Sequence, residues 1–356
     1  MPPPKTPPAN EPYRTLKQDL SAGSLGRLYL FHGEETYLRD HYLEQMKKQL
    51  IPEGLESFNY HRLEGRQCNA QALSQLVDSL PMMSARTLLV VSDCDLFQAP
   101  EEEREAFAAL LSTLPDYCCL VFVYDIIPYK SDGRMKKLAA AIRDHGSVVD
   151  FRRQSQGDLT DWIHRRFKAL GKTIGTAEAQ YLIFLCGDLM HGLISEIEKI
   201  GAYTSHSRVT RADIDAVAIP QLDAVVFQMT DALMSRDFSK AAGVLGDLLH
   251  MQEPPIKILA VLGKHFRQLL TARLALDRGR DAVYLMELWG LRSSYPAQKL
   301  LTAARHFGLS WCRRAVIRCA ETDVAMKSLP GIDSQDLLIS LLAELSAGEV
   351  PSHAAH

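Results

Sequence analysis

Several patterns that mark common functional sites are missing from this 356-residue sequence. None of its seven cysteines forms a CxxC pair, and no group of cysteines and histidines has the spacing of zinc ligands. There is no run of about 18 apolar residues that could span a membrane. No GxSxG or HExxH motif indicates a hydrolase or a zinc protease. An odd number of cysteines without a disulfide framework is typical of a reducing cytoplasm.

The sequence also lacks an excess of either charge. It has 40 basic and 43 acidic residues, a net charge of −3, with 47% hydrophobic and 23% charged residues. This balance is typical of a globular protein and provides no overall attraction to nucleic acid or to an anionic membrane. The length predicts two or three domains. Residues 1–10 are rich in proline and have no apolar core of a secretory signal, so we expect a disordered tail there.

The first part of the chain alternates between short apolar segments and amphipathic helical patterns. Each apolar segment is bounded by turn residues, as is typical of a buried strand. Strands that alternate with helices predict βαβ units and a parallel sheet with helices on both faces, an α/β domain. The predicted strands are 27–32, 58–63, 87–91, 120–124 and 147–151.

Beyond residue 152 the strand signals stop and helical periodicity continues to residue 345. Glycines and prolines such as Gly171, Gly187 and Pro330 interrupt the periodicity and predict helix ends. We therefore expect a small all-α domain and then an all-α helical bundle. The predicted parts are a Pro-rich tail (1–24), the α/β domain (25–151), the small helical domain (152–220), the bundle (221–346) and a second tail (347–356).

The turn after the first strand is where an α/β nucleotide-binding domain carries its phosphate loop. Such a loop, GxxxxGK[ST], needs glycines for close backbone approach and a lysine for the phosphates. Here the turn contains Gly33, Glu34, Glu35 and Thr36, with one glycine, no lysine and two carboxylates that would repel ATP. We predict a degenerate loop that does not hydrolyse ATP, with no catalytic residue, metal ion or cofactor in the chain.

The two adjacent glutamates in this turn also resemble a catalytic carboxylate pair. Adjacent side chains point in divergent directions, however, so Glu34 and Glu35 are poorly suited to share a proton. A charge at a helix N-terminus or a contact with another subunit is the favoured interpretation.

The turn before the third strand carries two large apolar side chains, Met82 and Met83, preceded by Leu80 and Pro81. Turns between a helix and a strand are normally polar and solvated. Flexible thioethers suit a surface that fits into a partner's pocket, but they can equally fill a local core. The residues themselves leave both interpretations open.

A basic cluster follows the fourth strand and consists of Lys130, Arg134, Lys136 and Lys137. Such a cluster is a candidate for contacts with DNA phosphates. A solvated helix face explains it at least as well, given the acidic balance of the chain. We therefore treat these four residues as a secondary candidate site.

Two segments carry a specific resemblance to the delta subunit family of the bacterial DNA polymerase III clamp loader. Residues 30–38 (LFHGEETYL) resemble the family's opening strand and turn, Tyr-x-Gly-Glu-Glu-x-Phe-Leu. Residues 80–88 (LPMMSARTL) resemble its Leu-Pro-Leu-Phe-Ser-x-Arg-x-Leu turn. Weaker similarities follow in the same order at 187–189, 196–199, 253–255 and 323–331, so the resemblance extends over about residues 25–345.

The resemblance implies an AAA+-like domain without a functional P-loop, a lid-type domain and a collar domain. It implies a protein without enzymatic activity of its own that binds the sliding clamp (the beta subunit) and holds one interface of the ring open for loading onto primed DNA. The implied wedge is Met82 and Met83, where the family more commonly has Leu-Phe. An aromatic ring is the stronger anchor, so the affinity is expected to be lower, or the wedge to include Leu80 and Pro81.

The other partners implied are the ATPase subunits (gamma or tau) and the delta-prime subunit, and the implied location is the cytoplasm, at the replisome on the nucleoid. No membrane partner is expected. Two rival functions remain to be compared with this one. An active AAA+ ATPase is disfavoured by the missing lysine and glycines, and a stand-alone DNA-binding module would depend on the basic cluster.

Overall fold

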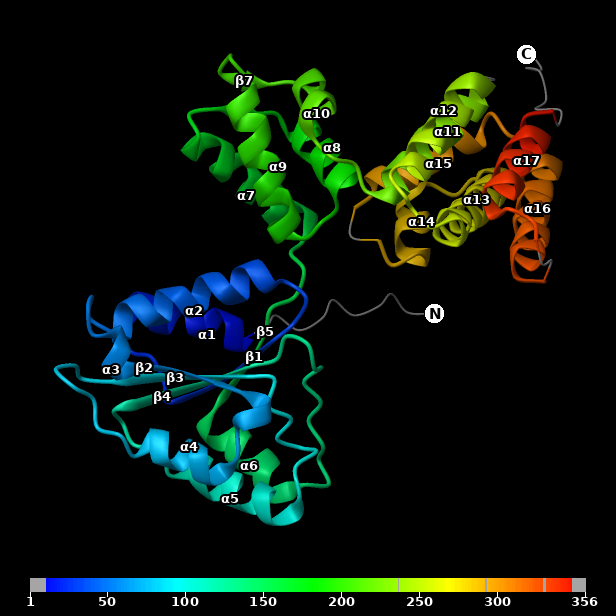
Figure 1. Ribbon diagram of the computed structural model, residues 1–356. Coiled ribbons are helices and arrows are strands. Elements are labelled where there is room, and N and C mark those ends of the chain that lie inside the picture. Colours follow the sequence, from blue (N-terminus) through cyan, green and yellow to red (C-terminus); the bar gives the residue numbers. More distant parts are fainter. Residues whose placement is uncertain (1–10, 236, 292, 329–330, 348–356) are drawn as a thin grey trace. The chain divides into compact units, whose positions relative to one another are not determined.

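The computed structural model describes residues 11–235, 237–291, 293–328 and 331–347 (Figure 1). The chain forms two compact units. The first contains the residues up to Gln154 together with Leu189–His191, and the second contains Ser155–Asp188 and the residues from Gly192 onward. The tails predicted at residues 1–10 and 348–356 lie outside the described residues.

The first unit is built around a five-stranded sheet of order β2-β3-β4-β1-β5 in which every pairing is parallel. The inner strands are continuous apolar runs because both of their faces are buried. This architecture confirms the predicted α/β class. The strands are β1 (Leu28–His32), β2 (Tyr60–Glu64), β3 (Thr87–Ser92), β4 (Cys118–Val123) and β5 (Ser147–Asp150).

Helices cover both faces of this sheet (Figure 1). Along β1, Tyr29 and Phe31 pack into the core under α1 and α2, and Leu28 and Leu30 pack into the core under α4, α5 and α6. This alternation follows from the two-residue period of a strand. The helices are α1 (Glu11–Ala22), α2 (Thr36–Leu50), α3 (Glu56–Asn59), α4 (Ala70–Val77), α5 (Glu101–Ser112) and α6 (Lys136–His145), with a short 3-10 turn at Gly65–Gln67.

Helix α1 differs from the prediction that residues 1–24 form a tail. Tyr13, Leu16 and Leu20 recur at helical spacing and pack against the sheet, and Leu16 is only 1% exposed. The Tyr13 ring meets Phe151 edge-on, with 5.8 Å between the ring centroids. A narrow apolar stripe is enough for a helix that docks on an existing core. The stripe is short and directly follows a proline-rich stretch, so the sequence alone predicts one tail for both.

The second unit is helical apart from one short parallel pair, β6 (Thr173–Ile174) with β7 (Arg208–Val209). The prediction that no strand follows residue 152 is therefore wrong. Strands of two residues leave no periodic signal in a sequence. The N-terminal helices of this unit are α7 (Gln156–Ala169), α8 (Thr176–Cys186), α9 (Met190–Tyr203, whose first two residues belong to the first unit) and α10 (Arg211–Val217).

The rest of the second unit is a helical bundle around the long helix α13 (Pro255–Asp277). Phe266, Trp311 and Phe307 lie at the centre of its core. The predicted division at residue 220 stays a prediction, since both helical parts fall in one unit. No described helix is long and apolar enough to cross a membrane. The other bundle helices are α11 (Leu222–Met234), α12 (Phe238–His250), α14 (Ala282–Leu288), α15 (Tyr295–Ala304), α16 (Leu309–Ser328) and α17 (Ser334–Ala347).

The docking of α1 can be tested with Leu16→Ala. Removing this buried side chain leaves a cavity, and we expect the free energy of unfolding of the first unit to fall by about 2–4 kcal/mol. Urea denaturation would measure the change, with the exposed Gln18→Ala of the same helix as the control. Equal stabilities of the two variants would contradict a docked helix.

Candidate functional site

The turn with the two methionines lies at the edge of the sheet where the parallel strands begin. It connects α4 to the first residue of β3. Strand β2 pairs with β3 in a register that places Tyr60 beside Leu88. This pairing brings Asn59, the residue before β2, next to the turn although 23 residues separate it from Met82.

The apolar side chains of this turn point to solvent. The exposed fractions are 74% for Leu80, 56% for Met82 and 87% for Met83, and Pro81 is partly buried. The interpretation of the methionines as local core is therefore wrong. Large apolar side chains gathered at a surface are typical of a site that another protein covers.

The backbone beneath these side chains is held by hydrogen bonds from both ends of the turn. The Met82 N–H donates to Oδ1 of Asn59 at 2.7 Å, and Nδ2 of Asn59 donates to the Met82 carbonyl at 2.8 Å. On the other side, the Ser84 hydroxyl lies 3.2 Å from the Leu50 carbonyl oxygen and 3.0 Å from that of Arg86. The methionines are thus flexible side chains on a fixed loop.

The guanidinium of Arg86 secures the end of the turn to the sheet. Its Nη1 donates to the Leu25 carbonyl at 2.6 Å, and its Nη2 donates to the carbonyls of Gly26 at 2.7 Å and Cys118 at 3.3 Å. The planar guanidinium has five N–H donors, which allows one side chain to reach three carbonyls in this way. Arg86 therefore ties the turn to the segment before β1 and to β4.

Met83 has a φ of 54°, in the left-handed region that residues other than glycine rarely adopt. This conformation costs about 1 kcal/mol and persists only where the surrounding structure imposes it. The hydrogen-bonded residues on both sides, Met82 and Ser84, provide that constraint. The strain coincides with the most exposed apolar side chain of the turn, as is common at functional sites.

The degenerate nucleotide loop lies at the opposite edge, where the strands end. Gly33 has a φ of 121°, and a Cβ atom on it would lie 2.4 Å from the carbonyl oxygen of Phe151. The Glu35 N–H donates to the same carbonyl at 2.9 Å. The glycine is therefore required by the close approach of the segment after β5.

The two glutamates of the loop have different environments, as the sequence predicts for adjacent residues. Glu34 is exposed, and its Oε2 accepts a hydrogen bond from Nε of Arg153 at 2.6 Å. Glu35 is fully buried, and its Oε2 accepts one from the backbone N–H of Met190 at 3.3 Å, within the first unit. Thr36 then begins α2. Neither carboxylate faces the other across a shared site.

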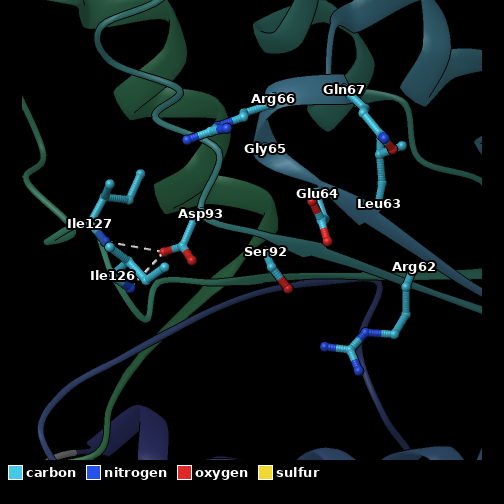
Figure 2. A pocket seen from close by; sticks show the side chains of 10 residues that line it. All are labelled: Arg62, Leu63, Glu64, Gly65, Arg66, Gln67, Ser92, Asp93, Ile126 and Ile127. Atoms are coloured by element: carbon cyan, nitrogen blue, oxygen red, sulfur yellow. Dashed lines mark hydrogen bonds between the residues drawn. The ribbon is translucent and has the colours of Figure 1, made fainter.

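Polar groups at this edge of the sheet bind one another. Oδ1 of Asp93, just after β3, accepts hydrogen bonds from the N–H groups of Asp125, Ile126 and Ile127 at 2.9, 2.9 and 3.1 Å, two of which are drawn in Figure 2. Nη1 of the buried Arg39 donates to Asp125 at 2.7 Å. The carboxylates at this edge are thus already paired with groups of the protein.

A cavity of about 980 Å³ lies beside Asp93, at the carboxyl ends of β2 and β3. Arg62, Glu64, Arg66 and Ile126 are among its lining residues (Figure 2). It is bounded by β2 and not by the Gly33 turn, so it is not the position of a phosphate loop. Its mixed charges do not point to one class of ligand.

A cluster of aromatic side chains lies at the end of β1. The rings of His32 and Tyr129 stack with centroids 5.1 Å apart, and Tyr124 meets Tyr129 edge-on at 5.1 Å. Burial lowers the pKa of His32, although the carboxylate of Asp150 at 3.6 Å opposes this effect. The lowered pKa favours the neutral imidazole of His32, which lacks the positive charge of a phosphate-loop lysine.

The basic cluster is only partly available to a ligand. Arg134 forms hydrogen bonds to both carboxylate oxygens of Asp132, at 3.1 and 2.7 Å, and Lys137 lies 2.6 Å from Oε1 of Glu105. Lys130 and Lys136 are exposed. Because two of its four cations already have carboxylate partners, the cluster is a weaker candidate site than the methionine turn.

Within the described parts of the chain, no group of three or more His, Cys, Asp or Glu side chains is arranged to hold a metal ion. Sequence reasoning also missed Asn59, which is fully buried and holds the methionine turn. The only available signal was an asparagine just before a strand, which is common in turns. Its role depends on a long-range contact.

Two family models match the chain. The model for the DNA polymerase III delta subunit matches residues 29–151, and the model for its C-terminal domain matches residues 223–343. Together these segments cover more than half of the sequence.

Individual relatives agree with these models. The chain is 22% identical to the DNA polymerase III subunit delta of Bacillus subtilis, over 91% of this chain and 94% of that protein. It is 22% identical to the probable DNA polymerase III subunit delta of Aquifex aeolicus, over 93% and 94%. Among solved structures, it is similar to the Bacillus subtilis DNA clamp loader delta protein, with a TM-score of 0.56, 21% identity and coverage of 94% and 99%.

The role of Asp93 as an internal acceptor can be tested with two variants. Asp93→Ala removes the acceptor of three N–H groups at a residue with a φ of 54°, and we expect a loss of about 2–3 kcal/mol in the free energy of unfolding. Asp93→Asn keeps an oxygen acceptor and tolerates that φ, so the loss should be below about 1 kcal/mol. Denaturant titration of both variants measures this difference, and equal losses would contradict the assignment.

Proposed function

Since the chain belongs to the DNA polymerase III delta subunit family, we propose that it acts in a clamp loader as the subunit that binds the sliding clamp and holds the ring open. The observation that carries this proposal is the pair of exposed methionines, Met82 and Met83, on a loop held by hydrogen bonds at both ends. The proposed result is a clamp that can be placed on primed DNA.

The proposed mechanism uses binding energy and no chemical step. Met82 and Met83, with Leu80 and Pro81 beside them, enter an apolar pocket of the clamp. A ligand shifts an equilibrium only by the difference in its affinity for the two states. The wedge must therefore fit the open ring better than the closed ring. A fixed loop suits this task because little conformational freedom is lost on binding.

The proposed partners besides the clamp are the ATPase subunits (gamma or tau) and delta-prime, which the chain meets through its C-terminal bundle. ATP bound by those subunits would control when the wedge is presented. The protein is proposed to work in the cytoplasm at the replisome. Its first unit contributes no ATP hydrolysis, because the Gly33 turn lacks a lysine and Asp93 is engaged by three backbone N–H groups.

Clamp binding should depend on the two methionines. In a folded Met82→Ala/Met83→Ala variant we expect the binding free energy for the sliding clamp of the same organism to weaken by about 2 kcal/mol or more, as for an interface hot spot. Surface plasmon resonance or calorimetry would measure it against wild type.

The matched control is Ile126→Ala. Ile126 is 86% exposed, nearly as much as Met83, but it follows β4 at the opposite edge of the sheet. Its replacement should leave clamp binding unchanged. Full binding by the double methionine variant would place the contact elsewhere, and no binding by wild type, even with the other loader subunits present, would refute the proposed function.

Nucleotide should not stabilise the isolated chain. A ligand at about 100 times its Kd would stabilise the folded state by about 2.7 kcal/mol. We expect millimolar Mg-ATP to leave the thermal midpoint of this chain unchanged, while it raises that of an active ATPase subunit measured in parallel. A raised midpoint, or retention of labelled ATP, would instead support the rival function of an active ATPase.

A further inference from the structure

We propose that Asn59 is a positioning residue of the clamp-binding site, which holds Met82 and Met83 in the conformation that the clamp recognises. This inference rests on the proposed function, since it concerns how the same surface is presented. Asn59 has no exposed surface, so it cannot itself touch a partner. Any effect it has on binding must pass through the residues that it contacts.

The contacts of the Asn59 side chain use its full donor capacity. Oδ1 accepts the Met82 N–H at 2.7 Å, and Nδ2 donates to the carbonyls of Met82 at 2.8 Å and Leu55 at 3.2 Å. Both bonds to Met82 engage the backbone of one residue, as a neighbouring strand would. They fix the position and the direction of the chain at the first methionine.

These contacts require an asparagine. An aspartate keeps the acceptor but has no donor, and its charge would face two carbonyl oxygens. A leucine of similar shape would leave the Met82 N–H and carbonyl without partners. A glutamine is longer by one methylene group, and the Asn59 side chain that it would replace has no exposed surface. The chemistry therefore matches the observed residue and not its closest replacements.

The position of Asn59 makes it the anchor on the α4 side of the methionines. The contacts of Ser84 and Arg86 hold the turn only on the β3 side of Met83. Ser79 is bonded to α4 through its N–H and its hydroxyl, but between Ser79 and Ser84 the described hydrogen bonds to the backbone come from Asn59. Without Asn59 this part of the loop would be free to move, and the left-handed φ of Met83 would no longer be imposed. The loop would then have to be ordered upon binding, which lowers affinity.

The first experiment observes the loop directly. In the ¹⁵N-labelled full chain, the backbone amides of Met82 and Met83 should relax in wild type as those of ordered residues do. In Asn59→Ala both amides should relax as those of a mobile loop. The amide of Met46, which is fully buried in the same unit, serves as the internal reference and should not change. Unchanged relaxation of the Met82 and Met83 amides would overturn the inference.

The second experiment measures clamp binding in a double-mutant cycle. We expect Asn59→Ala and Asn59→Asp each to raise the Kd for the clamp about tenfold, as expected when a preorganised loop becomes mobile. In the Met82→Ala/Met83→Ala background, Asn59→Ala should have no further effect, because a residue that acts only through the methionines is fully coupled to them. Independent, additive losses would overturn the positioning role.

The Leu16→Ala variant distinguishes a positioning role of Asn59 from a general loss of stability of the first unit. That variant weakens the first unit at α1, away from the turn, and should bind the clamp as wild type does. If it lost as much affinity as Asn59→Ala, the effect would be a general loss of folded protein and the inference would fail. If Asn59→Ala binds the clamp as tightly as wild type does, the inference fails and the proposed function stands. If wild type itself does not bind the clamp, the proposed function fails as well.

Discussion

The parallel pairing of β2 with β3 is the constraint on which the candidate site depends. Its register sets Tyr60 beside Leu88, and the residues just before these strands are therefore neighbours. Asn59 reaches the Met82 backbone only because of that register. A shift of one residue in this pairing would move Asn59 away from the Met82 backbone and send each β3 side chain to the opposite layer of helices, so the geometry of the turn depends on the register.

The two ends of the parallel strands differ in the groups that they expose. At the edge where the strands end, the Asp93 carboxylate accepts the Asp125 N–H, Arg39 donates to the Asp125 carboxylate, and Tyr129 stacks on His32. The polar groups of this edge are thus engaged within the protein. At the edge where the strands begin, the polar groups lie in the backbone and the apolar side chains face outward. The parallel α/β unit thus carries, where its strands begin, a surface suited to protein binding.

The methionine turn combines a rigid backbone with adaptable side chains. Hydrogen bonds from Asn59, Ser84 and Arg86 reduce the entropy that the loop has left to lose on binding. The unbranched thioethers of Met82 and Met83 can still adjust to the shape of a pocket. In the proposed complex, this combination would compensate in part for the absence of an aromatic anchor.

Local patterns in the sequence predicted most elements of the fold and the candidate residues. The strand signals predicted all five strands of the sheet, the missing lysine predicted a degenerate loop, and two methionines in a turn pointed to the candidate surface. The tertiary structure alone decided that those methionines are exposed, that Asn59 anchors them and that Asp93 is an internal acceptor. It also decided that residues 11–22 form a docked helix. The reason is that periodicity records which face of an element is buried, whereas hydrogen bonds between residues 23 to 34 positions apart exist only after the strands have paired.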